Sequence, residues 1–204
     1  GRRWAPAPHP LDPHVSTFQM SADGAAYAFA LTQRRREARD GLVVLSGRFT
    51  PDADGGEGEG SLLMDLDAAR VIGAGSGQGQ VWVDYAVRAG WIDLTVRFDD
   101  ARFGLGEPPN DLAYRFRRAP DGAGVFDFAF PDEQGRPVRV RSRWDATGAG
   151  RADATITDGD REATLSECWD PSFGAVYTQY GLLREGDEAA CAFAEREAPG
   201  APLD

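Results

Sequence analysis

The segment LAYRFRRAPDGAGVFDFAF, residues 112–130, predicts a β-hairpin and fixes its register. A two-residue Asp-Gly loop would set Phe116 opposite Asp127 and so mix an apolar with a charged side chain. A three-residue loop at 120–122 instead pairs Phe116 with Phe126, and it gives Pro and Gly the turn positions that they prefer. The predicted strands therefore share one aromatic face, made of Tyr114, Phe116, Phe126, Phe128 and Phe130.

Turn residues elsewhere in the chain predict more hairpins of the same kind. Residues 133–135 suit a second three-residue loop, and residues 89–90 and 159–160 suit two-residue loops. Because no helical pattern separates these hairpins, they predict an antiparallel meander. Period-two alternation gives the expected strands 15–22, 25–34, 42–50, 60–66, 79–88, 91–98, 111–118, 123–130, 136–144, 152–157 and 161–167.

The end of the chain shows a different pattern. After Glu167 the large apolar residues fall at helical spacing, Asp170 and Pro171 suit the start of a helix, and Gly181 suits its end. We therefore expect an all-β fold. It is an antiparallel β-meander of about ten to eleven strands, curved into an open or half barrel, with one short C-terminal helix.

The composition points to one β domain between two irregular ends. Residues 1–14 are rich in proline and lack periodicity, which is typical of an extended arm or tether. Residues 15–196 are expected to form a single β domain, since all-β domains of this size are common, and residues 197–204 a frayed tail. No apolar run is long enough for a transmembrane helix, so we expect no transmembrane span.

The net charge of −11 at pH 7 argues against nucleic acid as a partner, because a polyanion repels an acidic protein. A local exception is a row of arginines expected on one face of three adjacent strands. This row is either a site for an anionic lipid head group or acidic partner, or an ordinary outward face partly neutralised by Asp127. It consists of Arg115, Arg117, Arg139, Arg141 and Arg143.

Carboxylates are plentiful, which leaves a glycosidase-like pair open, but nothing in the sequence singles out two of them from an ordinary acidic surface. The two histidines, His9 and His14, lie in the Pro-rich arm, which offers no rigid scaffold to hold a catalytic imidazole. The sequence has no CxxC or HExxH motif, and the Gly-rich run 73–80 lacks the Gly-Lys-Ser/Thr ending of a phosphate-binding loop. We therefore expect no catalytic residue, no enzyme activity and no cofactor.

One acidic loop is a weak candidate for calcium. Residues 51–60 place four carboxylates in a Gly-rich turn, and hard cations favour such oxygen clusters. The spacing is not that of an EF-hand, because Leu63 occupies the position of the bidentate acid. We therefore favour a flexible acidic loop over a metal site. The four carboxylates belong to Asp52, Asp54, Glu57 and Glu59.

Cys168 and Cys191 are the two cysteines of the chain. Cys168 has no rigidly held histidine to make it a nucleophile, and only one other thiol with which to share a metal ion. From the residues alone, Cys168 is either a buried free thiol or half of a disulfide.

The segments SECWDPSFGAVY (166–177) and EGDEAACAFAE (185–195) resemble the ending of uncharacterised envelope lipoproteins from predatory, GC-rich proteobacteria. In those proteins an ECWD..F..VY segment and a later GD..AC.F segment close an all-β domain. The resemblance implies an exported, lipid-anchored protein with a bridge between Cys168 and Cys191, and it carries no activity. The lipid anchor would lie upstream of Gly1.

These expectations converge on a non-catalytic binding or scaffold module of the bacterial cell envelope. Its partner would be an envelope protein or a lipid, in the periplasm or at the outer-membrane surface. The alternative is a periplasmic carrier of lipid or lipoprotein, in which the rings of residues 114–130 line an apolar cavity on the concave face of the sheet.

Overall fold

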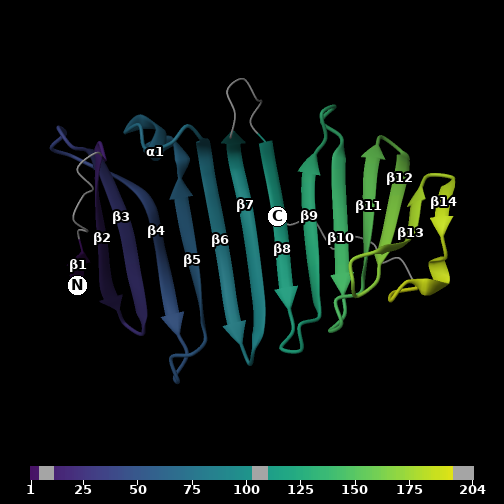
Figure 1. Cartoon of the computed structure of the whole chain (residues 1–204). Coiled ribbons are helices and arrows are strands. Elements are labelled where there is room, and N and C mark those ends of the chain that lie inside the picture. The colour runs from purple at the N-terminus through teal and green to yellow at the C-terminus, as the bar shows by residue number, and fades with distance from the viewer. Residues whose placement is uncertain (5–11, 103–109, 195–204) are drawn as a thin grey trace. The chain divides into compact units, whose positions relative to one another are not determined.

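A computed structural model of the chain describes residues 1–4, 12–102 and 110–194. Fourteen strands in these ranges form one antiparallel meander, in which each strand lies beside its neighbours in sequence (Figure 1). The edges of the sheet are β1 (Arg2–Trp4) and β14 (Leu183–Gly186), so the sheet is not closed into a barrel. The all-β meander is confirmed, and the strand count is 14 rather than ten to eleven.

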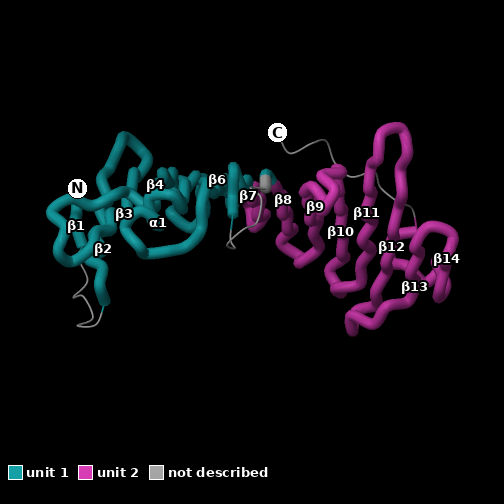
Figure 2. The backbone as a smooth tube through the Cα atoms, turned by 90° about the horizontal axis from the view of Figure 1, so that it is seen from above, with its two compact units in different colours: residues 1–87, 96–111 teal, residues 88–95, 112–204 magenta. Residues whose placement is uncertain are grey.

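The chain divides into two compact units, which Figure 2 shows in different colours. Unit 1 consists of residues 1–87 and 96–111, and unit 2 of residues 88–95 and 112–204. Besides β1, unit 1 contains β2 (His14–Asp23), β3 (Ala26–Arg35), β4 (Leu42–Pro51), β5 (Gly58–Asp65), α1 (Leu66–Val71) and most of β6 (Gln78–Arg88) and β7 (Trp91–Arg102). The hairpin tip between β6 and β7 belongs to unit 2.

Unit 2 holds the remaining strands and one short 3-10 helix. Its elements are most of β8 (Asn110–Arg118), and all of β9 (Gly124–Pro131), β10 (Pro137–Trp144), β11 (Gly150–Asp158), β12 (Arg161–Trp169), β13 (Ala175–Tyr180), β14 and η1 (Glu188–Ala190). The eleven predicted strands correspond to β2–β12. The structure adds β1, which lies in the predicted arm, and β13 and β14 at the other end of the chain.

The predicted C-terminal helix is wrong, because residues 175–180 form strand β13. Asp170 does not cap a helix. Its Oδ1 accepts hydrogen bonds from the amides of Ser172 and Gly174, which closes a hairpin turn with Phe173 in the left-handed region at φ 63°. A bulge between Cys168 and Trp169 then shifts the register and hides the period-two pattern of the next strand.

The predicted hairpin registers of unit 2 are confirmed. Phe116 pairs with Phe126, and Asp127 lies between Arg115 and Arg141. The turn that sets this register is the expected one, with Gly122 in the left-handed region at φ 97°. The turns at 133–135 and 159–160 likewise give the predicted pairs.

Unit 1 also has an apolar face. One row of paired side chains crosses its strands and consists of Trp4, Phe18, Leu31, Leu45, Met64 and Val81. In the neighbouring rows, Phe29 lies over Gly47 and Tyr85 lies over Gly60, where a Cβ atom would collide with the ring. Aromatic rings thus cover glycines on adjacent strands, which shields the backbone there from water.

Candidate functional site

One face of unit 2 carries an unbroken row of apolar side chains across seven strands. Directly paired residues of antiparallel strands point to the same side, so the registers of β8 to β14 define this row. In strand order the row is Tyr114, Phe128, Val140, Ala154, Leu165, Tyr180 and Leu183. We call the surface that this row shares with Phe116, Phe126, Phe130, Val138, Trp144 and Ala152 the aromatic face.

Large rings concentrate on β8 and β9 and form what we call the aromatic ridge. Ring centroids are 5.5 Å apart for Tyr114 and Phe126, 6.0 Å for Phe126 and Phe128, and 4.8 Å for Phe128 and Phe130. With Phe116, these are the residues that the sequence predicts to line an apolar cavity. They are adjacent as expected, and each is half-buried, because a single sheet shields its side chains only from beneath and from the sides.

Small side chains on β11 form a trough beside the aromatic ridge. Ala152 and Ala154 make this trough, and they lie at one edge of a shallow hollow that extends over β12 to β14, where Leu165, Glu167, Tyr180 and Leu183 line it. Two of these lining residues are strongly exposed, Tyr180 by 68 % and Leu183 by 74 %. The aromatic face therefore presents a ridge and a trough side by side.

Two tryptophans fix the end of this face at the hairpin turns. Trp144 lies over Gly124, and Trp169 lies over Gly150 in the same way one hairpin further on. Each indole Nε1 donates to a turn carbonyl of the preceding hairpin at 2.9 Å, Trp144 to Gly122 and Trp169 to Gly148. This repeated contact joins successive hairpins and holds the aromatic face in place.

The opposite face of unit 2, which we call the polar face, carries charges of alternating sign. Arg115, Asp127, Arg141 and Asp153 are paired in that order across β8 to β11. Asp93 of β7 extends the series and accepts two hydrogen bonds from Arg115, at 3.1 and 2.6 Å. These hydrogen bonds raise the pKa of the Arg115 guanidinium above its ordinary value. Such cross-strand pairs of opposite charge stabilise a sheet.

The five arginines predicted as an anionic-ligand face all lie on the polar face. Besides the pairs above, Arg117 lies 3.3 Å from Asp93, and Arg143 lies 3.9 Å from Asp153. Arg139 is exposed, and no carboxylate among the described residues lies within ion-pair distance of it. Three carboxylates, those of Asp93, Asp127 and Asp153, thus pair with four of these five arginines, and Arg139 faces solvent.

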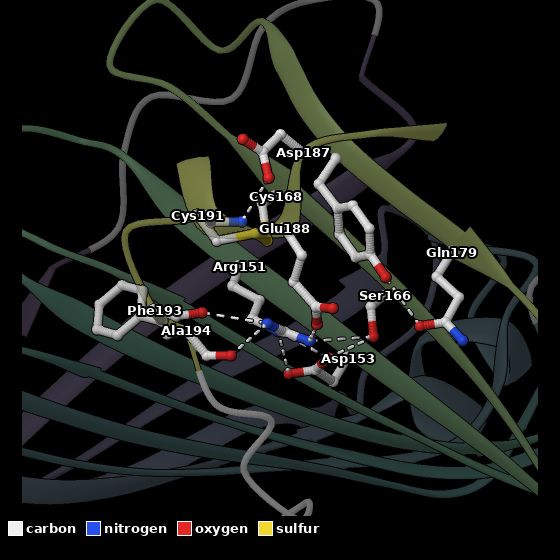
Figure 3. Close-up of a disulfide and its surroundings, with 12 residues drawn as sticks. Arg151, Asp153, Ser166, Cys168, Gln179, Asp187, Glu188, Cys191, Phe193 and Ala194 are labelled. Atoms are coloured by element: carbon white, nitrogen blue, oxygen red, sulfur yellow. Dashed lines mark hydrogen bonds and ion pairs between the residues drawn. A yellow bond between two sulfur atoms is a disulfide. The ribbon is translucent and has the colours of Figure 1, made fainter. Parts of the chain in front are cut away.

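A disulfide closes the polar face at its C-terminal end. Cys168 and Cys191 are bonded, with Cα atoms 5.4 Å apart, so the expected bridge is confirmed. The bridge ties residues 187–194, which we call the C-terminal strap, to β12 (Figure 3). Together with the buried Tyr177 on β13, the two cysteines form a small core under the strap.

Beneath the strap lies Arg151, whose side chain is fully buried (Figure 3). Its Nε lies 3.0 Å from Asp153 Oδ1, and its Nη1 donates to the carbonyl oxygens of Phe193 and Ala194 at 3.1 and 3.2 Å. Ser166 donates to the same carboxylate at 2.6 Å. A buried charge is tolerated when it is paired and hydrogen-bonded in this way.

Two further contacts fasten the strap to the sheet. Glu188 Oε1 lies 3.3 Å from Arg151 Nη2, and the guanidinium of Arg143 lies 4.8 Å from the centre of the Phe193 ring. The strap thus covers the part of the polar face around Arg143 and Arg151 with the chain's own residues. Sequence reasoning missed this cluster, because the partners of Arg151 include backbone carbonyls about 40 residues away and no residue-type pattern reveals them.

The four carboxylates of the acidic loop are not gathered into one cluster among the described residues. Asp52 instead closes the turn between β4 and β5: its amide donates to the Glu57 carbonyl at 3.0 Å, and its carboxylate accepts from the Glu57 amide. Across residues 1–4, 12–102 and 110–194, no group of three or more His, Cys, Asp and Glu side chains is arranged to hold a metal ion.

His14 differs in position from what the sequence suggests. His14 begins β2, and its Nε2 lies 3.0 Å from the carbonyl oxygen of Ile72, so it belongs to unit 1 and not to an arm outside the fold. His9 and the predicted tail 197–204 lie outside the described residues.

The helices that the structure describes are all too short or too polar to cross a bilayer. Comparison with protein-family models, curated proteins and solved structures finds no match. The argument for function therefore depends on the geometry of unit 2.

Proposed function

We propose that the chain is a non-catalytic binding or scaffold module of the bacterial cell envelope, and that it binds through the aromatic face of unit 2. The supporting observation is the difference between the two faces of one sheet. The polar face is partly neutralised by paired charges and partly covered by the C-terminal strap, whereas the rings of the aromatic face stay half-exposed. Contiguous exposed apolar surface is typical of interaction sites.

The envelope assignment is supported by the disulfide, since such bonds persist in oxidising compartments such as the periplasm. The C-terminal resemblance to envelope lipoproteins points to the same place. An anchor upstream of Gly1 would hold the module at a membrane surface, where its partner is an envelope protein.

A second candidate function is a carrier of lipid or lipoprotein. The hollow next to the trough favours it, because Ala154, Leu165, Tyr180 and Leu183 line it with apolar atoms that suit an acyl chain. The open sheet argues against a carrier with an enclosed cavity, because a ligand bound on this face stays in contact with water.

Native mass spectrometry of the chain purified from its native host tests the proposal. We expect a stoichiometric protein component on the wild-type chain, and its loss from Phe128→Asp, which puts a charge on the aromatic ridge. Arg139→Asp, an exposed change on the polar face of the neighbouring strand, is the control and should keep the component.

A bound acyl lipid in place of protein would support the carrier instead. A wild-type chain that carries neither, or a bound component that survives Phe128→Asp, would contradict binding through the aromatic face.

A further inference from the structure

We infer that the occupant of the aromatic face is a second copy of this chain, packed face to face with its aromatic ridge in the partner's trough. This inference depends on the proposed function and names the partner of the same surface. The inference is based on the uneven size of the side chains on this face: large rings lie on β8 and β9, and alanines lie on β11.

The division follows the strands. Phe126 and Phe128 stand on β9, and directly across β10 the matching positions on β11 are Ala152 and Ala154. A two-fold axis along β10 brings β9 of each copy over β11 of the other. Each ridge then fills the trough of the other copy, and both contacts form at once because a two-fold interface is self-complementary. Val140 lies on the axis and meets its own counterpart.

The size of the face suits a stable dimer. Five strands spaced by about 4.8 Å, with eight or so residues each at about 3.3 Å, cover roughly 600 Å² in projection. The accessible area of a surface with a ridge and a trough is larger than its projection. A standard interface buries about 800 Å² on each partner, so β8–β12 alone supply most of it. Two sheets that pack in this way lie about 10 Å apart, as in a β-sandwich.

The rim of the face is also self-complementary. Charged residues of both signs lie on the same side of the sheet, and Glu167 and Glu185 continue the row of Phe126 and Ala152. The two-fold axis brings β8 of one copy over β12 of the other, so Arg118 of one copy lies near Glu167 of the second. All of these charged residues are exposed. They are Arg118, Asp158, Arg161, Glu167 and Glu185.

An unpartnered sheet face also needs a second layer on energetic grounds. Globular domains bury the apolar side of a sheet against another layer, and the chain places its own covering segment, the strap, on the polar face. A lipid would fill the trough but leave the ridge exposed. A second copy covers both.

Sedimentation equilibrium of the full chain tests the inference. The wild type should have twice the 22.0 kDa mass of one chain. Phe128→Asp on the ridge and Ala154→Arg in the trough should each weaken self-association by about 100-fold or more, because each buries an unpaired charge. Arg139→Asp on the polar face should not change it.

Mixing the two variants provides the sharper test, because one of the two symmetric contacts then joins the introduced carboxylate of one chain to the introduced guanidinium of the other. The second contact keeps the native pair of Phe128 and Ala154. An equimolar mixture of Phe128→Asp and Ala154→Arg should therefore recover the dimer, although neither variant dimerises alone. Urea unfolding of each monomer checks that both variants fold. Added salt should strengthen the wild-type dimer, since two chains of charge −11 repel each other.

Three results would overturn the inference: a wild type that stays monomeric, a dimer that both variants leave intact, or a mixture that stays monomeric. The same experiments distinguish a failure of this inference from a failure of the proposed function. If the wild type is monomeric but still binds another envelope component through Phe128, the function stands and the second copy is the wrong partner.

Discussion

Replacing Cys191 with alanine should release the C-terminal strap and destabilise unit 2. The bond closes a loop with a sequence separation of 23 residues. In the chain-entropy model, the loss of such a cross-link costs about 3 kcal/mol, since the unfolded chain regains its freedom. The carbonyl oxygens of Phe193 and Ala194 also leave Arg151, and water replaces them in part, so this loss adds at most about 1–2 kcal/mol.

Urea unfolding followed by tryptophan fluorescence measures this loss, because Trp144 and Trp169 report on unit 2. Amide exchange at Asp187, which donates to the Val176 carbonyl at 3.1 Å, reports on the strap itself. In Cys191→Ala and in the reduced wild type, the free energy of unfolding should fall and amide exchange at Asp187 should become faster. The exposed neighbouring change Ala190→Ser is the control. A loss below about 1 kcal/mol, with Asp187 still protected, would refute the argument that the disulfide holds the strap.

Three other predictions concern unit 2. Arg151→Met should lower the free energy of unfolding in urea by about 3–5 kcal/mol, because it leaves the buried carboxylate of Asp153 without its main partner. The double variant with Asp153→Leu should lose less than Arg151→Met alone, because it removes the unpaired charge as well. Gly150→Ala should cost about 1–3 kcal/mol because the added Cβ meets an indole ring, whereas Gly56→Ala, which meets nothing, should be neutral in the same assay. Hydrogen bonds from Ser172 and from backbone amides lower the pKa of Asp170, so its stabilisation is complete above the ordinary carboxyl pKa and is lost as the pH falls through the lowered one. An NMR titration that gives Asp170 an ordinary or raised pKa would contradict this assignment.

Turn chemistry made most of the meander predictable from sequence. Only one register puts Pro120 and Gly122 at the turn positions that they prefer and also pairs the aromatic rings across the two strands. The structure has that register. Where a hairpin turn uses residues that helices also use, the sequence was ambiguous. Asp170 and Pro171 suit a helix start as well as a turn, and the bulge after Cys168 removed the alternation that would have decided between them.

A recurring sequence feature could have revealed β13. Trp144-Asp145 and Trp169-Asp170 both precede a turn that ends near a glycine, and both tryptophans lie over the preceding hairpin. The aromatic face was predictable because its members alternate along single strands. The trough beside it was not, since it appears only when the registers of β10 to β14 are combined.

Hydroxyl-radical footprinting across a dilution series tests the central claim, that the aromatic face is an open surface completed by a partner. When the chain is dilute and single, the rings of Tyr114, Phe126 and Phe128 should oxidise readily, and they should become protected as the partner binds. Tyr177, buried under the strap, should stay protected throughout. Rings on the aromatic face that are as protected as Tyr177 in the dilute single chain would contradict the account.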